Sequence, residues 1–181
     1  MELVFNSLRM KHIAYLSLGS NIGDRRSALQ EAIERIGKSV GTVVRQSAFY
    51  ETEPWGFDSD NLFLNAAVCV ETALCPRCLL EATQRIELEM GRTEKFKVPS
   101  SVPSSVSSSS IPSSPSSRVY HDRIIDIDIL LYDDITVDEP DLKIPHPLMN
   151  EREFVMQPLR EISLTPKSLT PNPSPSGEGS R

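Results

Sequence analysis

The chain has 181 residues, 39% of them hydrophobic, and a formal net charge of −6. This length suits one domain with tails, and the mild acidity argues against a general nucleic-acid or membrane binder. No signal peptide or apolar run long enough to cross a bilayer is visible, and three cysteines suit a reducing compartment, so we expect a cytoplasmic protein.

Two segments have the composition of chain that does not fold by itself. Residues 98–117 contain only valine, proline, serine and isoleucine, and residues 163–181 are rich in serine, proline, threonine and glycine. Neither has enough apolar surface to offset its ordering entropy. We expect a disordered insertion and a disordered tail there, and a domain over residues 11–162. Residues 1–10 are then an appendage, and Met10 offers an alternative start.

Hydrophobic patterning predicts six main elements. Apolar runs that end in turn residues indicate strands, and spacing such as that of Leu29, Ala32, Ile33 and Ile36 indicates a helix. In chain order we expect a strand at 12–20, a helix at 24–37 capped by Gly37, strands at 42–52 and 63–72, a helix at 76–90 and a strand at 123–132.

This element order is that of the ferredoxin-like βαββαβ arrangement. It predicts an α+β domain in which both helices pack on one face of an antiparallel sheet and the other face is open to ligands. Residues 133–145 are expected to add a hairpin or an edge strand, and a short helix is expected to start at Asn150.

Cys75 and Cys78 form a C-x-x-C motif between a predicted strand and a predicted helix, which is the context of a thioredoxin-like redox pair. The alternative is two ordinary cysteines in a first helical turn with Pro76 at its favoured position, and the motif alone favours this alternative. A zinc site is favoured still less, because it needs two more ligands and the three histidines are scattered.

The segment RIIDIDILLY at 123–132 places two carboxylates in an otherwise apolar strand. Alternation puts Ile125, Ile127 and Ile129 on one face and Asp126 and Asp128 on the other. Two like charges at this spacing repel. A bound Mg²⁺ ion removes this repulsion, and Mg²⁺ is usually held by one or two carboxylates plus substrate phosphates. The alternative, two aspartates on a solvated sheet face, is the better reading of a bare D-x-D.

Basic residues surround this strand. Arg123 lies three positions before Asp126, and further cations flank the insertion: Arg92, Lys95, Lys97, Arg118 and His121. Cations beside a metal site fit a triphosphate, although a mixed-charge surface loop explains them equally well. His146, between two prolines, and Arg152 are further candidate phosphate ligands.

Aromatic and amide side chains form a second group of candidates. Phe63 and Asn65 share a strand face, and Phe154 and Trp55 offer further rings. A ring beside an amide that both donates and accepts suits a flat heterocycle. Core packing is the alternative for Phe63 and for Phe154.

Several of these segments together resemble one family. RIIDIDILLY after Tyr120-His121-Asp122, and AYLSLGSNIGDR near the start, are similar to motifs of the 6-hydroxymethyl-7,8-dihydropterin pyrophosphokinases of folate biosynthesis. SAFYETEPWG, FLNAAVCVET, TQRIELEMGR and IPHPLMNEREFVMQPL resemble that family's further motifs in the same order. The resemblance covers about residues 12–162, with the interruption at 98–117.

The resemblance implies an ATP-dependent diphosphotransferase. In that family the pterin hydroxymethyl oxygen attacks the β-phosphorus of ATP, the pterin diphosphate forms and AMP leaves. Positioning and charge stabilisation dominate such a transfer. The resemblance also implies that the ligands are ATP, the pterin and Mg²⁺. We further expect a monomer without nucleic-acid or membrane partners.

The same resemblance implies roles for individual residues. Asp126 and Asp128 ligate two Mg²⁺ ions, and Arg92 and Arg123 contact phosphates, with Arg92 on a loop that closes over the substrates. Phe63 and Phe154 sandwich the pterin, while Asn65 and the backbone near Thr52 and Trp55 read its polar edge. The ATP site is lined by Gln84, Arg92, Ile129, His146 and Arg152.

The chain departs from the family pattern near the insertion. Tyr120-His121-Asp122-Arg123 stands where many relatives have W-G-P-R, and Glu94 stands where a second basic residue is common, so Lys95 is its candidate substitute. The insertion falls in the catalytic loop, where loop length costs the fold little but closure is more vulnerable. Two alternatives remain open. One is a palm-like nucleotidyltransferase, and the other is a pterin- or nucleotide-binding module impaired by its insertion.

Overall fold

The computed structural model describes residues 11–57, 59–92 and 122–163. The N-terminal appendage, the insertion at 98–117 and all but the first residue of the predicted tail lie outside these ranges, so the predictions about them stay open. Lys95, Lys97, Arg118 and His121 lie outside the described residues as well.

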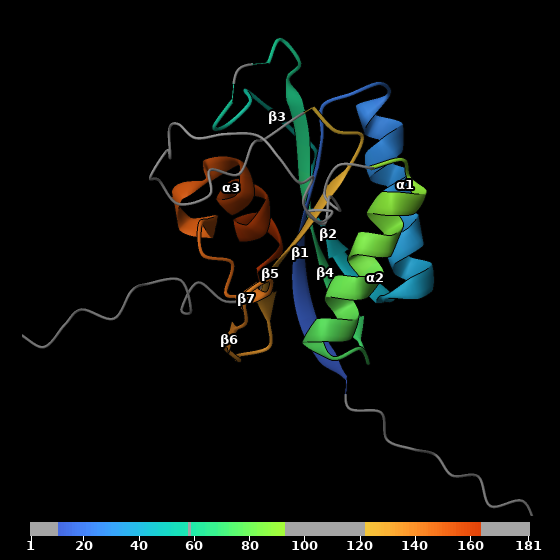
Figure 1. Cartoon of the computed structure of the whole chain (residues 1–181), viewed down its shortest axis with the longest axis vertical. Coiled ribbons are helices and arrows are strands. Elements are labelled where there is room, and N and C mark those ends of the chain that lie inside the picture. Colours follow the sequence, from blue (N-terminus) through green and yellow to red (C-terminus); the bar gives the residue numbers. More distant parts are fainter. Residues whose placement is uncertain (1–10, 58, 93–121, 164–181) are drawn as a thin grey trace, which may run out of the picture.

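An antiparallel sheet forms the centre of the molecule (Figure 1). Its strands lie in the order β2-β4-β1-β5. The short strand β3 also pairs with β4, along residues 63–65, whereas β2 pairs with residues 68–72. The bounds are β1 His12–Ser20, β2 Gly41–Gln46, β3 Tyr50–Thr52, β4 Phe63–Thr72 and β5 Asp126–Tyr132. The two longest strands, β1 and β4, pair along their whole length and so form the floor on which the other elements pack.

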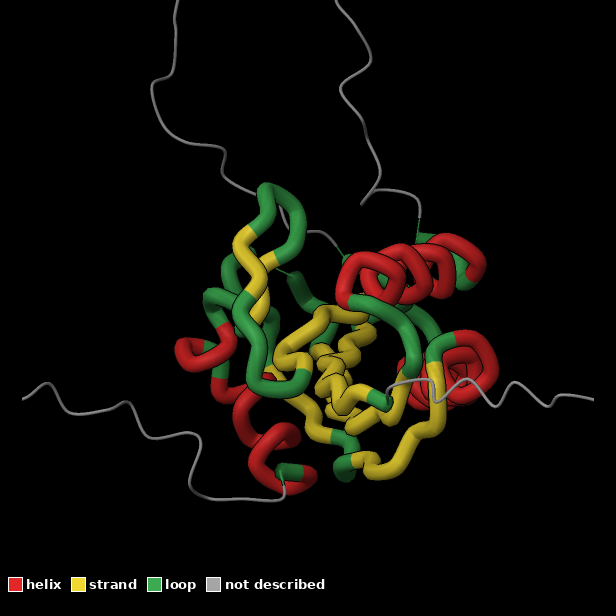
Figure 2. The backbone as a smooth tube through the Cα atoms, turned by 90° about the horizontal axis from the view of Figure 1, so that it is seen from below, coloured by secondary structure: helices red, strands yellow, loops and turns green. Residues whose placement is uncertain are grey.

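Helices cover both faces of this sheet (Figure 2). Helix α1 (Arg25–Ser39) contacts β1, β2 and β4, and α2 (Pro76–Glu89) contacts β5 and α1. Helix α3 (Glu153–Ile162) contacts β4, β1 and β3 and lies on the opposite side of the sheet (Figure 1). The predicted α+β, ferredoxin-like class is confirmed, and the added finding is that α3 covers part of the face expected to be open.

The alternation of β5 assigns its side chains to two cores. Ile125, Ile127 and Ile129 are buried under α1 and α2, together with Leu16 and Leu18 of β1. A second, smaller cluster lies under α3 and contains Ala67, Cys69, Leu130, Val155, Met156, Leu159 and Ile162. Each fully buried branched side chain contributes about 1.5–3 kcal/mol, so both faces of the sheet are held by apolar packing.

The helix ends follow from local sequence. Asp24 caps α1, since its carboxylate accepts the backbone N–H of Ser27 at 3.0 Å and the hydroxyl of Ser27 at 2.8 Å. Gly37 lies inside this helix, so the predicted cap at Gly37 is wrong: the apolar face continues through Ile36 to Val40, whose N–H bonds to the Ile36 carbonyl. Gly91, at φ 95°, lies just beyond the end of α2.

The strand predicted at 42–52 is two strands in the structure. Ser47 interrupts it: its backbone N–H donates to the Ala67 carbonyl at 2.9 Å, while its hydroxyl oxygen accepts the Ala67 N–H at 2.9 Å. The hydroxyl thus takes the place of a backbone acceptor, and β2 and β3 pair separately with β4.

The C-terminal elements agree with the sequence prediction. The expected hairpin is β6 (Val137–Asp138) with β7 (Lys143–Ile144). A 3₁₀ turn at Met149–Glu151 leads into α3, which is longer than the short helix predicted from Asn150. None of the helices in the described ranges combines the length and the apolar character needed to cross a bilayer.

Candidate active site

The pocket lies over Gly19, a residue without a side chain near the end of the central strand β1. Cross-strand register places Asn65 of β4, Gly19 of β1 and Asp126 of β5 in one row. Neighbouring strands lie about 4.8 Å apart, so Asn65 and Asp126 are separated by about 10 Å. A Cβ on Gly19 would lie 3.2 Å from Oδ1 of Asn65. The glycine therefore leaves open the floor between an amide and a carboxylate.

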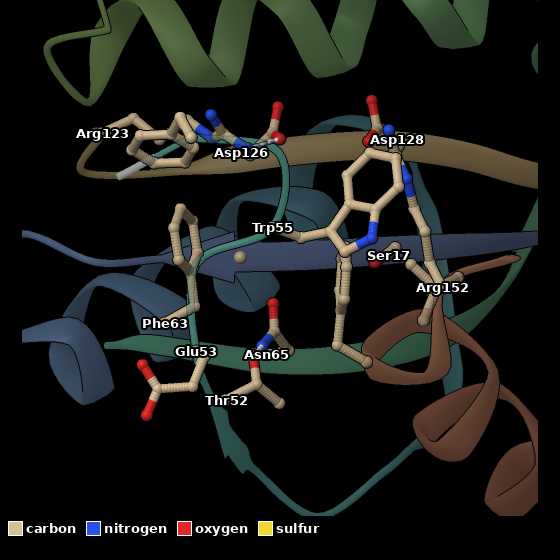
Figure 3. A pocket seen from close by; sticks show the side chains of 14 residues that line it. Ser17, Thr52, Glu53, Trp55, Phe63, Asn65, Arg123, Asp126, Asp128 and Arg152 are labelled. Atoms are coloured by element: carbon tan, nitrogen blue, oxygen red, sulfur yellow. Dashed lines mark hydrogen bonds and ion pairs between the residues drawn. The ribbon is translucent and has the colours of Figure 1, made fainter. Parts of the chain in front are cut away.

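Side chains from four strands (β1, β3, β4 and β5), the β3–β4 loop, the segment before β5 and α3 surround this floor (Figure 3). The cavity measures about 40 Å³, well below the roughly 300–1,000 Å³ of pockets that hold small-molecule ligands. Its lining consists of Ser17, Gly19, Thr52, Glu53, Trp55, Phe57, Phe63, Asn65, Arg123, Asp126, Asp128, Arg152, Phe154 and Val155. A ligand of substrate size requires some of these side chains to move outward.

Aromatic rings form the walls, and cations and rings pack against them. The guanidinium carbon of Arg123 lies 5.1 Å from the ring centroid of Phe63, and that of Arg152 lies 4.4 Å from the ring of Trp55. The Trp55 and Phe154 centroids are 6.4 Å apart. The Arg123 guanidinium therefore lies over the ring of Phe63, while Trp55 meets Phe154 at an interplanar angle of 54°. Both phenyl rings have faces of the kind on which a planar heterocycle stacks.

The polar side of the pocket is fixed by β3 and β4. Asn65 is 3% exposed, and its Nδ2 donates to the hydroxyl of Thr52 at 2.9 Å. This bond holds the amide group of Asn65 against β3. The Asn65 carbonyl oxygen points to the floor above Gly19, because a Cβ on that glycine would lie only 3.2 Å from it, and it offers an acceptor to a ligand with N–H groups.

The carboxylates lie on the opposite side of the floor beside two arginines. Oδ2 of Asp126 lies 2.9 Å from Arg123, and Oδ1 of Asp126 bonds to Nη1 of Arg92. Burial disfavours the charge of Arg92, but the carboxylates of Asp126 and Glu87 outweigh that effect and raise the pKa of Arg92. The site thus balances its acidic groups with its own basic groups.

Glu87 is a buried carboxylate that the sequence analysis did not single out. It projects from α2, has no side-chain exposure, lies 2.5 Å from Arg92, and accepts the backbone N–H of Ile127 at 2.7 Å. Ile127 lies between the two aspartates, so Glu87 ties the strand to the arginine. One signal was available: Glu87 lies four residues after Thr83, on the apolar face of its helix.

Asn21 and Asp122 hold the chain around Arg123. The backbone N–H of Asn21 donates to the Arg123 carbonyl at 3.1 Å, and Oδ1 of Asn21 accepts the Arg123 N–H at 2.7 Å. The Asp122 carboxylate accepts from Asn21, Ser59 and Asn61 at 2.6–2.7 Å. These bonds lower the pKa of Asp122, Ser59 contributing most, and they join the β3–β4 loop to the segment that carries Arg123.

The structure brings most of the predicted site residues together. Nine line the pocket: Thr52, Trp55, Phe63, Asn65, Arg123, Asp126, Asp128, Arg152 and Phe154. Arg92 joins them through Asp126. The pocket lining also includes Ser17, Gly19, Glu53, Phe57 and Val155, which the sequence analysis did not propose.

Besides Arg92, three residues predicted for the ATP site lie outside this lining. Gln84 is half-buried on α2, and Ile129 is 6% exposed in the core under the helices. His146 is half-buried, and its backbone N–H donates to the Leu130 carbonyl at 2.9 Å. Their contact with a nucleotide stays a prediction.

The carboxylates at the pocket suit Mg²⁺ better than a metal that needs three or more protein ligands. Asp126 and Asp128 are half-buried at the pocket, and the described part of the chain holds no cluster of three or more His, Cys, Asp or Glu side chains suited to a metal. Mg²⁺ is commonly bound through one or two carboxylates together with water and phosphate oxygens, so a carboxylate pair at the edge of this pocket is compatible with it.

Comparison with known proteins gives one consistent result. Residues 15–164 match the model of the 7,8-dihydro-6-hydroxymethylpterin-pyrophosphokinase family. The 2-amino-4-hydroxy-6-hydroxymethyldihydropteridine pyrophosphokinase of Porphyromonas gingivalis is 45% identical over 163 residues, which is 88% of this chain and 98% of that protein. The protein of the same name from Bacillus subtilis is 39% identical over 154 residues, covering 84% and 79%.

Solved structures show the same fold. The crystal structure of wild-type Plasmodium falciparum HPPK-DHPS superposes with a TM-score of 0.60 at 17% identity. The match covers 84% of this chain and 41% of that one, so this chain spans about two fifths of that protein. At this identity the likeness concerns the fold alone.

Proposed function

The chain belongs to the 7,8-dihydro-6-hydroxymethylpterin-pyrophosphokinase family, and from that premise we propose that its pocket binds both substrates of the reaction. The chain is a transferase that moves diphosphate from ATP to 6-hydroxymethyl-7,8-dihydropterin in folate biosynthesis, in line with relatives at 39–45% identity. The observation that carries the site assignment is the row Asn65–Gly19–Asp126, which places an amide and a carboxylate on either side of an open floor.

The pterin end is proposed at the aromatic and amide side. A pterin that enters between Phe63 and Phe154 takes the positions now held by the Arg123 guanidinium and the Trp55 ring. Stacking of a planar base on an aromatic side chain is worth about 1–3 kcal/mol. The Asn65 carbonyl and the backbone around Thr52 and Trp55 then meet the polar edge of the ring, and the Thr52–Asn65 bond keeps the amide oriented.

The phosphate end is proposed at the carboxylates and arginines. Asp126 and Asp128 would hold Mg²⁺, two ions in our proposal, and the metal supplies charge neutralisation for the ATP phosphates when bound. Arg92 and Arg123 both pair with Asp126 in the structure. When phosphates bind, both guanidinium groups can turn to them, because an arginine binds phosphate oxygens through the same donors.

Transfer itself requires alignment rather than covalent participation by the protein. The pterin oxygen must approach the β-phosphorus in line with the departing AMP oxygen, and held geometry supplies most of such an acceleration. Stacking residues fix the pterin and the arginines fix the phosphates, so the short row across β4, β1 and β5 sets the distance between the two reacting groups. Gln84, Ile129, His146 and Arg152 are proposed to contact the rest of ATP.

We propose a monomer that acts in the cytoplasm on small molecules, without nucleic acid or membrane. The family match argues for the pyrophosphokinase over the nucleotidyltransferase, and the wide sequence separation of Gly19-Ser20 from Asp126 argues the same way.

Product analysis tests this function. The full chain, incubated with ATP, Mg²⁺ and 6-hydroxymethyl-7,8-dihydropterin, is expected to produce AMP and the pterin diphosphate in equal amounts by chromatography. Release of inorganic diphosphate with transfer of the nucleotide contradicts it in favour of a nucleotidyltransferase. Pterin binding without AMP formation contradicts it in favour of a binding module.

A further inference from the structure

The two cysteines at the start of α2 lie together at the surface, away from the pocket. Both are exposed, and their sulfur atoms are 2.7 Å apart. Helix α2 begins at the lower end of the sheet in Figure 1, past the end of β4, whereas the pocket lies at the beginning of β4. A ten-residue strand spans about 30 Å, and neither cysteine lines the pocket.

The backbone arranges this pair for bond formation. Cys75 is the N-cap of α2, and its sulfur accepts the backbone N–H of Cys78 at 3.2 Å. Pro76 follows at the first helical position, where its fixed φ holds the turn. A disulfide has an S–S bond of about 2.05 Å, so the sulfurs need to approach by only a small distance, and both already belong to one helical turn.

The two sulfur atoms are chemically unequal. The thiol and the backbone N–H of Cys78 lower the pKa of Cys75, whereas hydrogen bonding to Cys75 raises the pKa of Cys78. Thiolates rather than thiols attack disulfides. Cys75 also holds the N-cap position, where its sulfur accepts the Cys78 N–H and a thiolate is favoured, so Cys75 suits the attacking role and Cys78 the resolving role.

From this geometry we propose that Cys75 and Cys78 form a redox-active dithiol that exchanges with low-molecular-weight disulfides. The Cys75 thiolate attacks one sulfur of the disulfide, which breaks, and one small thiolate leaves. Cys78 then loses its proton to solvent and attacks the Cys75 sulfur, which releases the second small thiolate. The protein dithiol has lost two electrons and two protons, and the disulfide has become two thiols.

Cys69 provides an internal comparison. It is 1% exposed in the cluster under α3, and burial raises its pKa, so it should stay inert under the same conditions. Arg77, between the two reactive cysteines, forms ion pairs with Glu139 and Asp141 of the β6–β7 hairpin. These ion pairs hold the first turn of α2 against the hairpin.

Incubation of the full chain with oxidised glutathione tests the proposal. The wild type should lose two hydrogen atoms by intact mass, peptide mapping should locate the bond between Cys75 and Cys78, and dithiothreitol should restore the dithiol. Cys78→Ser should stop at a glutathione adduct on Cys75. Cys75→Ser should react at least about tenfold more slowly, and Cys69→Ser should match the wild type.

Two results would overturn the proposal. One is a wild-type chain that gathers glutathione adducts without forming the internal bond, and the other is equal reactivity of the Cys75→Ser and Cys78→Ser variants. AMP formation by Cys75→Ser should equal that of the wild type, so the outcome is independent of the proposed function. Circular dichroism of each variant confirms that the fold is intact before reactivity is compared.

Discussion

Oε1 of Glu87 lies 2.5 Å from Nη1 of Arg92 and 2.7 Å from the backbone nitrogen of Ile127, although the Glu87 side chain has no exposure. One carboxylate oxygen therefore joins α2, the strand between the two aspartates and an arginine that also contacts Asp126. Buried carboxylates are rare unless they are paired, so we expect Glu87 to hold Arg92 in position beside Asp126.

Replacing Glu87 by glutamine should separate this role from simple packing. Glu87→Gln keeps the volume and an acceptor for Ile127 but removes the charge beside Arg92. We expect kcat for AMP formation to fall by about 10–100-fold, the range for residues that orient site ligands, with KM for the pterin little changed. Glu87→Ala should in addition lose about 3–5 kcal/mol of stability.

Glu89→Gln is the matched control for Glu87→Gln. Glu89 belongs to the same helix but is exposed and pairs with Arg35, so its loss should change neither kcat nor the unfolding midpoint noticeably. Equal kcat values for wild type and Glu87→Gln would show that Glu87 only fills space.

Gly19→Ala tests the floor of the pocket. The added Cβ lies 3.2 Å from Oδ1 of Asn65 and 3.6 Å from Phe63, so it occupies space that the pterin needs while the strand remains intact. We expect the dissociation constant for the pterin, measured by calorimetry, to rise about tenfold, which is about 1.4 kcal/mol.

Gly37→Ala provides the control for that substitution. A Cβ there meets nothing within 4 Å, and Gly37 is inside α1, so alanine should stabilise the protein by about 0.5–1 kcal/mol and leave pterin binding unchanged. Unaltered pterin affinity in Gly19→Ala would contradict the placement of the pterin over Gly19.

Asp122 predicts a specific pH dependence of stability. Hydrogen bonds from Ser59, Asn61 and Asn21 hold its pKa below the ordinary value of 3.8, so its ionised form is favoured in the folded state. Its contribution is complete above the unfolded pKa and is lost as the pH falls through the lower folded pKa. The stability difference between wild type and Asp122→Ala, from urea unfolding, should be constant between about pH 5 and 7 and shrink below pH 3.8.

Ser59, a hydrogen-bond partner of Asp122, provides a second test of the lowered pKa. Ser59→Ala removes one donor and should shift the decline toward higher pH, because the folded pKa then returns toward 3.8. A stability difference that instead grows as the pH falls from about 5 to about 3 contradicts the assignment of a lowered pKa.

Deletion of residues 98–117 tests whether the insertion takes part in catalysis. The composition of this segment predicts no packed structure, and each doubling of loop length changes closure by only about 0.6 kcal/mol. We expect kcat to be preserved or raised. Removal of residues 164–181, a segment of similar length, serves as the control, and a kcat loss of more than about tenfold confined to the 98–117 deletion would contradict the prediction.

Periodicity predicted the elements that carry the site. The alternation of RIIDIDILLY correctly separated Ile125 and Ile127, which lie in the core, from Asp126 and Asp128, which face the pocket. The faces follow from a period of two residues, and a one-residue slip would have exchanged them. Strands β1 and β4 likewise have the predicted bounds.

The relationships between strands were beyond the sequence. Gly19 matters because register places it between Asn65 and Asp126, and a hydrophobic pattern does not give register across three strands. Glu87 was missed because a glutamate on a helix is normally solvated. Ser47 divides a predicted strand because its hydroxyl replaces a backbone acceptor, a choice that depends on the partner strand.

The turnover of Asp128→Asn tests most directly whether this carboxylate takes part in the reaction. The substitution keeps the shape of a half-buried side chain at the pocket but removes its charge, so metal and phosphates lose a ligand while the core is untouched. With saturating ATP, Mg²⁺ and pterin, AMP formation should fall on the order of 10²–10³-fold, with the unfolding midpoint and pterin affinity of the wild type. Turnover near the wild-type rate in the folded variant, or unfolding of the variant, would contradict the assignment of Asp128 to the reaction.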